Sequence, residues 1–132
     1  MKDRVEVAII GGGVVGCSIA YNLARLGVKD VAVYEKSFLA SGSTGRCGAG
    51  VRAQWGTEMN CRLAVAGIRA FETLPQELDY PDIEFKQGGY LILAFTKAQM
   101  DQFRKNVALQ NSLGIPSRLV TPEEARTIVP HL

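Results

Sequence analysis

A glycine-rich turn directly after a short apolar segment places the strongest constraint on the fold of this chain. The segment Val5–Ile10 leads into Gly11-Gly12-Gly13-Val14-Val15-Gly16, and the next apolar run, Val31–Tyr34, is followed by Glu35. A strand, a glycine turn, a helix, a second strand and a terminal carboxylate make up the βαβ unit that binds dinucleotides. We therefore expect residues 5–35 to form this unit.

Three glycines and the acidic residue have separate physical tasks in such a unit. Gly11 can adopt the backbone angles of the turn, Gly13 lets a pyrophosphate approach the main chain, and Gly16 allows close helix packing. The helix that begins here directs free backbone N–H groups and the positive end of its dipole toward the phosphates. We expect Glu35 to accept hydrogen bonds from the adenosine ribose and to disfavour the 2′-phosphate of NADP.

A glycine turn by itself is weak evidence, so the flanking sequence decides how much it means. Here an apolar strand precedes the turn, apolar residues recur after it at helical spacing, and Gly27 supplies a helix stop. The recurring apolar residues are Val15, Ile19, Leu23 and Leu26. The alternative is an ordinary βαβ unit that binds no ligand.

Composition excludes several classes of function. The 132 residues are 47% hydrophobic with a net charge of +2, and no basic run indicates a nucleic-acid surface. The three cysteines lack a C-x-x-C pair and only one histidine, His131, is present, so we expect no metal site. No apolar segment is long enough to span a bilayer. Reduced thiols favour a cytoplasmic location.

A loop of small residues over 37–56 is the second notable feature. It contains serine, threonine and several glycines together with Arg46 and Arg52. Hydroxyl and backbone N–H groups can line a phosphate chain, and arginine adds positive charge. We expect this loop to contact the cofactor, with a flexible surface connection as the alternative.

Beyond the loop, the pattern predicts a mixture of helices and short strands. The expected elements are a helix from Thr57 to Leu74 that Pro75 ends, strands over 83–86 and 90–95, a helix over 97–113, a strand over 118–120 and a helix capped by Thr121 with Pro122 and Glu124. The helix over 57–74 has Met59, Leu63, Ala66, Ala70 and Leu74 near one face. No further βαβ alternation follows the first unit.

Three segments together resemble a known family. They are Val7–Gly16, Tyr34-Glu35-Lys36 and Gly42-Ser43-Thr44-Gly45-Arg46-Cys47-Gly48. The chain resembles the N-terminal part of the FAD-dependent amine and amino-acid oxidoreductases of the D-amino-acid oxidase superfamily. Within it, the chain is most similar to the β subunits of sarcosine oxidase and of dye-linked L-proline dehydrogenase, to which residues 88–93 and 119–125 also correspond.

The resemblance implies an α/β fold: the N-terminal part of a Rossmann-like FAD-binding domain of the glutathione-reductase type, followed by the start of an α+β substrate domain. The implied boundaries are 1–80 for the FAD-binding part, with its flavin loop and following helix, and 81–132 for the substrate part. The cofactor-binding residues that it implies are Gly11, Gly13, Val14, Val15, Gly16, Glu35, Lys36, Ser43, Thr44, Gly45, Arg46, Gly48, Ala49 and Gly50. Arg52 stands where related oxidases bind the substrate carboxylate.

The implied activity is oxidation of the C–N bond of an amino acid or secondary amine, such as sarcosine or proline, by FAD. Implied partners are that small substrate and other subunits of a hetero-oligomeric enzyme. Two strands are too few for a complete nucleotide domain, so we expect the front part of a longer protein that holds FAD weakly when isolated. Stoichiometric flavin retained by the isolated chain through gel filtration would contradict this.

Two other functions use the same turn. An NAD-dependent dehydrogenase would need the glycines and Glu35, but its sequence usually continues with helix and strand rather than a loop like 37–56. A non-catalytic FAD-binding subunit of a larger complex is the second alternative. The identity of the bound cofactor distinguishes an NAD-dependent dehydrogenase from an FAD enzyme. Amine-dependent reduction of a dye by the full-length protein distinguishes a catalytic enzyme from a non-catalytic subunit.

Overall fold

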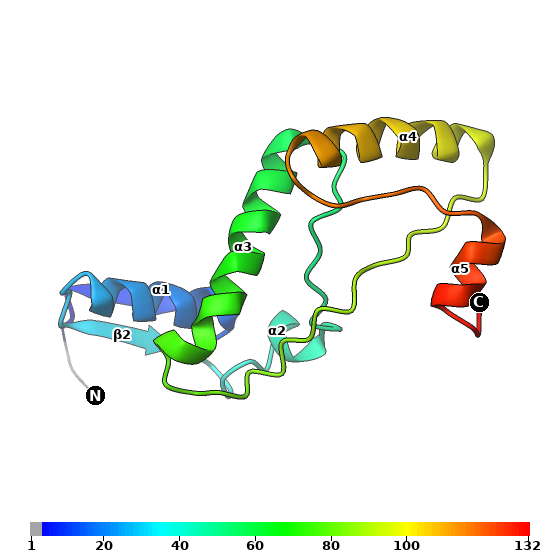
Figure 1. Ribbon diagram of the computed structural model, residues 1–132. Helices are drawn as coiled ribbons and strands as arrows, with labels where there is room; N and C mark the ends of the chain where they lie inside the picture. Colours follow the sequence, from blue (N-terminus) through cyan, green and yellow to red (C-terminus); the bar gives the residue numbers. More distant parts are fainter. Residues whose placement is uncertain (1–3) are drawn as a thin grey trace. The chain divides into compact units, whose positions relative to one another are not determined.

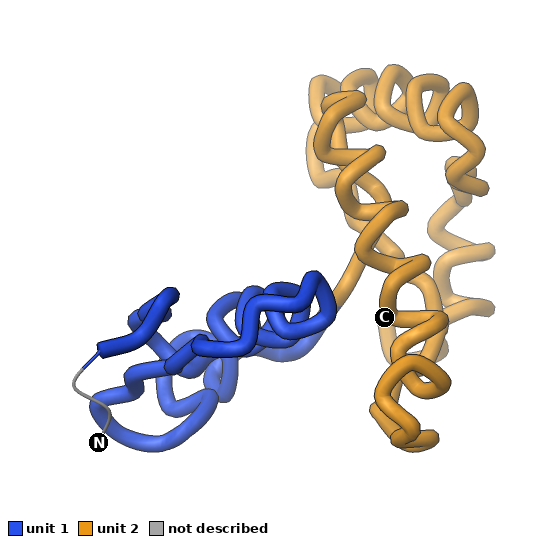
Figure 2. The backbone as a smooth tube through the Cα atoms, turned by 90° about the vertical axis from the view of Figure 1, so that its left-hand side faces the viewer, with its two compact units in different colours: residues 1–50 blue, residues 51–132 orange. Residues whose placement is uncertain are grey.

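The computed structural model describes residues 4–132 and divides them into two compact units, one ending at Gly50 and one spanning Val51–Leu132 (Figure 2). The first unit contains two strands and two helices, and the second contains three helices joined by extended segments (Figure 1). The glycine turn and the acidic residue after the second strand therefore belong to the same unit.

A βαβ arrangement forms the first unit, as the sequence predicts. Strand β1 (Val7–Ile10) pairs in parallel with β2 (Val31–Tyr34), in a register that places Val7 opposite Val31 and Ile10 opposite Tyr34. Helix α1 (Val14–Arg25) connects the strands and packs against both of them. Since parallel strands have their carboxyl ends at one edge, the turn after β1 lies beside the residues that follow β2.

The end of α1 has the expected glycine stop. Leu26 is the C-cap, and its N–H donates to the carbonyl of Asn22 at 3.0 Å. Gly27 follows with φ of +91°, a left-handed conformation that glycine adopts without a Cβ clash, and its N–H donates to the carbonyl of Ala24 at 3.0 Å.

The loop over 37–56 contains one element that the sequence analysis missed. A single turn of helix, α2 (Ser43–Arg46), forms after Gly42. The backbone N–H of Gly45 donates to the carbonyl of Ala40 at 2.9 Å, and a Cβ at Gly45 would collide with that oxygen. Small residues therefore allow a tight turn here rather than a fully irregular loop.

Three helices make up the regular structure of the second unit. They are α3 (Glu58–Glu77), α4 (Lys97–Ser112) and α5 (Pro122–Ile128), with α3 in contact with α4. The expectation that Pro75 ends α3 is wrong, because the helix continues through it for two more residues. Proline costs only one backbone hydrogen bond in a final turn, and the N–H of Leu78 still reaches the carbonyl of Leu74 at 2.9 Å.

The apolar face expected for α3 is not the buried one. Met59 is 65% exposed and Leu63 is 63% exposed, whereas Cys61 is fully buried. The helical periodicity is right, but the direction of the core was set by packing of α3 against other parts of its unit. Within residues 4–132, no helix is both long and apolar enough to cross a bilayer.

The strands expected over 83–86, 90–95 and 118–120 do not form. These residues have no regular secondary structure, and Figure 1 shows the segment between α3 and α4 as an irregular extended trace. A strand exists only when a neighbouring backbone completes its hydrogen bonds, and β-branched or aromatic composition does not supply that neighbour.

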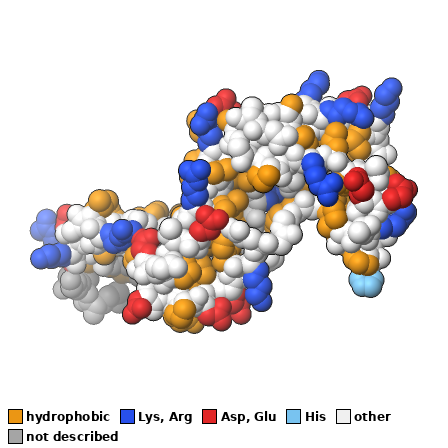
Figure 3. Space-filling model, viewed as in Figure 1, with side chains coloured by type: hydrophobic (Ala, Val, Ile, Leu, Met, Phe, Trp, Pro, Cys, Tyr) orange, Lys and Arg blue, Asp and Glu red, His pale blue; other side chains and the backbone are white. Residues whose placement is uncertain are grey.

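Large apolar side chains remain exposed in both units. The buried hydrophobic residues of the described chain are Ile9, Cys61, Ile115 and Ala125. By contrast, Ile10 is 83% exposed and Phe95 is 82% exposed, and Figure 3 shows apolar side chains reaching the visible surface in several places. Parallel sheets normally have both faces covered by further structure, so these surfaces are of the kind that pack against neighbouring elements.

Helix capping gives a first test of this structure. At the start of α4, Thr96 accepts from the N–H of Gln99 at 3.2 Å, and the Gln99 side chain accepts from the N–H of Thr96 at 3.1 Å. We expect Thr96→Ala to lower the free energy of unfolding by about 1 kcal/mol, measured by urea denaturation. Thr57→Ala is the matched control, because Thr57 caps α3 without a side-chain hydrogen bond and should change stability less. Equal losses would contradict the assignment.

Candidate functional site

The glycine turn after β1 depends on two positions that exclude a side chain. Gly11 has φ of +104°, and its N–H donates to the carbonyl of Tyr34 at 2.8 Å, which extends the pairing with β2 by one bond. A Cβ at Gly16 would collide with the carbonyl oxygen of Gly11. The close packing expected at Gly16 thus corresponds to a specific contact, in which α1 lies directly against the backbone carbonyl of Gly11.

Glu35 is joined to the turn by direct hydrogen bonds. Its Oε2 accepts from the N–H of Gly12 at 2.9 Å, and its Oε1 accepts from the N–H of Ser37 at 2.9 Å. Gly12 is buried, and a Cβ there would lie 2.6 Å from Leu39 Cδ2 and 3.2 Å from Glu35 Cβ. The sequence analysis assigned no role to Gly12. The signal was a glycine in the middle of the three, at a position where the spacing of the motif requires none.

These contacts set the ionisation of Glu35. The hydrogen bond from Gly12 lowers the pKa of the carboxyl most, the bond from Ser37 lowers it further, and partial burial opposes both. The backbone N–H and positive charge of Lys36 also lower the pKa. Hydrogen bonds donated to a carboxylate favour its charged form. Glu35 is therefore an anion at neutral pH, with lone pairs left to accept from a further hydroxyl donor.

The start of α1 presents free backbone donors. The N–H of Val14 donates to Thr44 Oγ1 at 3.0 Å, so α2 contributes a side chain to this end of the helix. Among residues 4–132, no acceptor lies within hydrogen-bond distance of the N–H groups of Gly13, Val15 and Gly16. The first turn carries no acidic side chain. Together with the helix dipole, these donors favour an anionic ligand.

The loop residues expected at the cofactor divide into two groups. Thr44 and Gly45 are held near the glycine turn through Ala40. The N–H of Ala40 donates to the carbonyl of Gly12 at 2.9 Å, and the N–H of Gly45 donates to the carbonyl of Ala40. The second group is exposed: Lys36 after β2, Ser43 and Arg46 in α2, and Gly48, Ala49 and Gly50 after it.

Backbone strain marks the same loop. Ala40 has φ of +63° and Ala49 has φ of +50°, both in the left-handed region that alanine rarely adopts. Each such residue costs on the order of 1–2 kcal/mol relative to an ordinary conformation. Two strained residues between 37 and 50 indicate that the surrounding fold holds the loop in this shape against the backbone conformation that these alanines prefer.

Arg52 belongs to the second unit, whereas the glycine turn belongs to the first. Its guanidinium carbon is 4.3 Å from the centre of the Trp55 ring. Its Nε is buried and has no hydrogen-bond partner. The sequence analysis named Arg52 but not Trp55, for which no motif in the sequence gave a signal.

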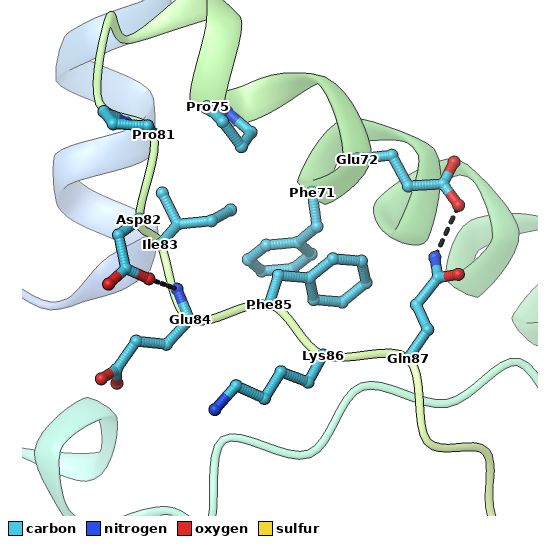
Figure 4. Close-up of a pocket in the computed structure, with 10 residues that line it drawn as sticks. All are labelled: Phe71, Glu72, Pro75, Pro81, Asp82, Ile83, Glu84, Phe85, Lys86 and Gln87. Atoms are coloured by element: carbon cyan, nitrogen blue, oxygen red, sulfur yellow. Dashed lines mark hydrogen bonds between the residues drawn. The ribbon is translucent and has the colours of Figure 1, made fainter.

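One hollow of the second unit is lined by none of the expected site residues. A cavity of about 500 Å³ lies between α3 and residues 81–87 (Figure 4). Phe71 and Phe85 stack in it with ring centres 5.4 Å apart, and Gln87 Nε2 donates to Glu72 Oε1 at 2.6 Å. The lining also includes the charged side chains of Glu84 and Lys86.

Across residues 4–132, no three His, Cys, Asp or Glu side chains gather in a group that could hold a metal ion. The groups that do gather in the first unit are N–H donors, a hydroxyl and one carboxylate, which match the diphosphate and ribose of a dinucleotide. The residues present therefore fit such a cofactor.

The low pKa of Glu35 generates a pH-dependent prediction. Its ionised form stabilises the fold fully above the ordinary carboxyl pKa, and this contribution is lost as pH falls through the lower pKa of the folded state. We expect Glu35→Gln to destabilise the protein at neutral pH in urea unfolding, and the difference from the parent to shrink in acid.

Glu58→Gln is the control for that comparison. Glu58 pairs with Arg62 at 2.8 Å on the exposed face of α3, where an ion pair contributes little. We expect this variant to match the parent closely at neutral pH. If the stability difference between Glu35→Gln and the parent stays constant as the pH falls, the negative charge of Glu35 is not what stabilises its contact with the turn.

Comparison with known proteins places this geometry in a family. The model of the family described as FAD dependent oxidoreductase (DAO) matches residues 6–132. Human mitochondrial dimethylglycine dehydrogenase is 36% identical over 132 residues, which cover 99% of this chain and 15% of that protein. Sarcosine oxidase subunit beta from Arthrobacter sp is 33% identical over 130 residues, covering 98% of this chain and 32% of that protein.

A solved structure agrees with these relatives. The crystal structure of L-proline dehydrogenase from P. horikoshii matches with a TM-score of 0.86 and 41% identity, covering 98% of this chain and 34% of that one. The chain thus spans about a third or less of the length of the proteins it matches. With the glycine turn, the carboxylate after β2 and a family match over nearly all of its residues, the chain belongs to the FAD-dependent oxidoreductase (DAO) family.

Proposed function

We propose that the first unit binds the ADP portion of FAD, with the diphosphate at the start of α1. The observation that carries this proposal is the set of free N–H groups at Gly13, Val15 and Gly16, at a helix end without acidic residues. Glu35 would accept from the adenosine ribose through lone pairs that Gly12 does not use. The family match favours FAD over NAD, the other cofactor that such a turn can hold.

The remaining site residues extend the proposal along the cofactor. Lys36, directly after Glu35, would lie near the adenine end. Ser43, Thr44 and Gly45 would contact the diphosphate and ribityl chain, and the exposed segment Arg46–Gly50, with Gly48 and Ala49, would pass beside the isoalloxazine. Residues 1–80 would then form the cofactor part and residues 81–132 the start of the substrate part.

The proposed reaction is oxidation of a C–N bond in an amino acid or secondary amine. FAD, when bound, takes up hydride or its equivalent from the carbon beside the nitrogen. The residues of this chain supply binding and orientation, with Arg52 proposed to hold the substrate carboxylate. The names of the relatives support this substrate class, since they act on dimethylglycine, sarcosine and proline.

Partners and location belong to the same proposal. The sarcosine oxidase relatives are named as β subunits, which supports a place in a hetero-oligomeric enzyme. The described cysteines are free, as expected of reduced thiols, and a cytoplasmic location stays a prediction from the sequence.

A visible spectrum of the purified full-length protein, rather than of residues 1–132 alone, tests the proposal, with chromatography of the cofactor that heat releases. We expect flavin absorption bands and released FAD, and bleaching of the bands by sarcosine or L-proline without oxygen. A protein that binds NADH and no flavin would contradict FAD binding. Bound FAD that no amine reduces would indicate a non-catalytic FAD-binding subunit.

Thr44 allows a sharper test of the cofactor site. Thr44→Val keeps the side-chain size but removes the oxygen that accepts from Val14 N–H, so we expect about a tenfold weaker FAD affinity. Thr44→Ser is the matched control, because it keeps the hydroxyl and should retain FAD. Affinity is measured by titration of the apoprotein with FAD. Equal losses in both variants would show that packing of Thr44, rather than its hydroxyl, matters.

A further inference from the structure

We propose that Trp55 is a positioning residue that holds Arg52 ready for a carboxylate, with Gln110 as its buried support. The inference rests on the proposed function, because it concerns how the substrate carboxylate would be recognised. It adds to that function two residues, far apart in the sequence, that determine preference for amino acids over simple amines. The evidence is a chain of contacts within the second unit.

Trp55 makes two contacts with Arg52, one with its guanidinium group and one with its backbone carbonyl. The guanidinium carbon of Arg52 lies 4.3 Å from the centre of the indole ring, and the indole Nε1–H donates to the backbone carbonyl of Arg52 at 3.0 Å. Stacking on an aromatic face attracts a guanidinium and restricts its rotation while leaving its N–H edge free. The hydrogen bond fixes the backbone from which the arginine side chain starts.

Trp55 is itself anchored from two helices. Its backbone carbonyl accepts from Gln110 Nε2 of α4 at 2.9 Å, and Cys61 Sγ of α3 lies 3.4 Å from the same oxygen. Gln110 is only 4% exposed and Cys61 is fully buried. A buried side-chain amide is costly unless it is bonded, so this contact specifies the position of residue 55 relative to α4.

Arg52 has donors that the described chain leaves without an acceptor. Its Nε is buried with no hydrogen-bond partner, and no carboxylate of residues 4–132 lies within ion-pair distance. By contrast, Arg62, Arg104 and Arg118 each pair with a glutamate or aspartate. The terminal Nη groups of Arg52 are not among the buried atoms, and an incoming carboxylate would accept from these donors, which no residue of the described chain occupies.

The consequence is a difference between two kinds of substrate. An amino acid would gain from a guanidinium that is already oriented, since less side-chain freedom is lost on binding. An amine without a carboxylate would gain nothing from Arg52 and would be insensitive to Trp55. Loss of Trp55 should therefore act on binding of the carboxylate rather than on the chemistry at the C–N bond.

Steady-state kinetics of the FAD-loaded protein test the inference. For Trp55→Leu we expect KM for sarcosine or L-proline to rise about tenfold, with kcat within twofold, and no change for dimethylamine or pyrrolidine. Trp55→Phe keeps an aromatic face and should recover most of the affinity, and Gln110→Leu should show a smaller rise. Arg104→Lys is the matched control, because Arg104 pairs with Asp101 on the exposed face of α4.

Equal effects on amino acids and on the amines that lack a carboxylate would overturn the inference, as would an unchanged KM in Trp55→Leu. A separate measurement distinguishes its failure from failure of the proposed function. Trp55 is the single tryptophan of the chain, so acetate at constant ionic strength should alter its emission, and Arg52→Leu should abolish the change. No response to acetate would overturn the carboxylate site even if FAD binds. A response without amine-dependent flavin reduction would support the site while contradicting the proposed function.

Discussion

The hydrogen bond from the backbone of Gly12 to the carboxylate of Glu35 is the contact on which the rest of the first unit depends. It ties the turn after β1 to the residue after β2, at the edge where both parallel strands end. The same contact lowers the pKa of Glu35 and keeps a negative charge beside the turn. Gly16 packs on the carbonyl of Gly11, so the start of α1 is held directly against the turn. Free N–H groups at the start of a helix favour an anionic ligand.

Both units have surfaces that their own residues do not cover. The two strands leave Ile10 and Tyr34 exposed, and residues 90–95 run as an extended segment without a partner strand. Apolar faces of parallel sheets and strand-like segments with open backbone are normally covered by neighbouring strands and helices. Each unit therefore has surfaces whose packing is incomplete, while the turn and the start of α1 in the first unit are well defined.

Features that a few adjacent residues decide were predicted correctly from the sequence, whereas features that need a distant partner were not. The βαβ unit, the stop at Gly27 and the capping box of Thr121 with Glu124 were all expected, because each is decided by a few adjacent residues. The strand expected over 90–95 does not form, since a strand needs a partner that composition cannot supply. The end of α3 was predicted wrongly for a related reason. A proline near the end of a helix is compatible with a helix that stops before it or with one that continues a few residues past it, and α3 continues to Glu77.

The sequence alone determined the glycine turn, the acidic residue after the second strand and the family. Those features are specified by residue type at fixed spacing. Glycine tolerates φ of +104° at position 11, and the two carboxylate oxygens of Glu35 accept from the N–H groups of Gly12 and Ser37. Only the tertiary structure decided that Thr44 reaches Val14 and that Gln110 supports Trp55, 55 residues away. Such pairs leave no local signature, because the chain between them, rather than their spacing, determines the distance at which they meet.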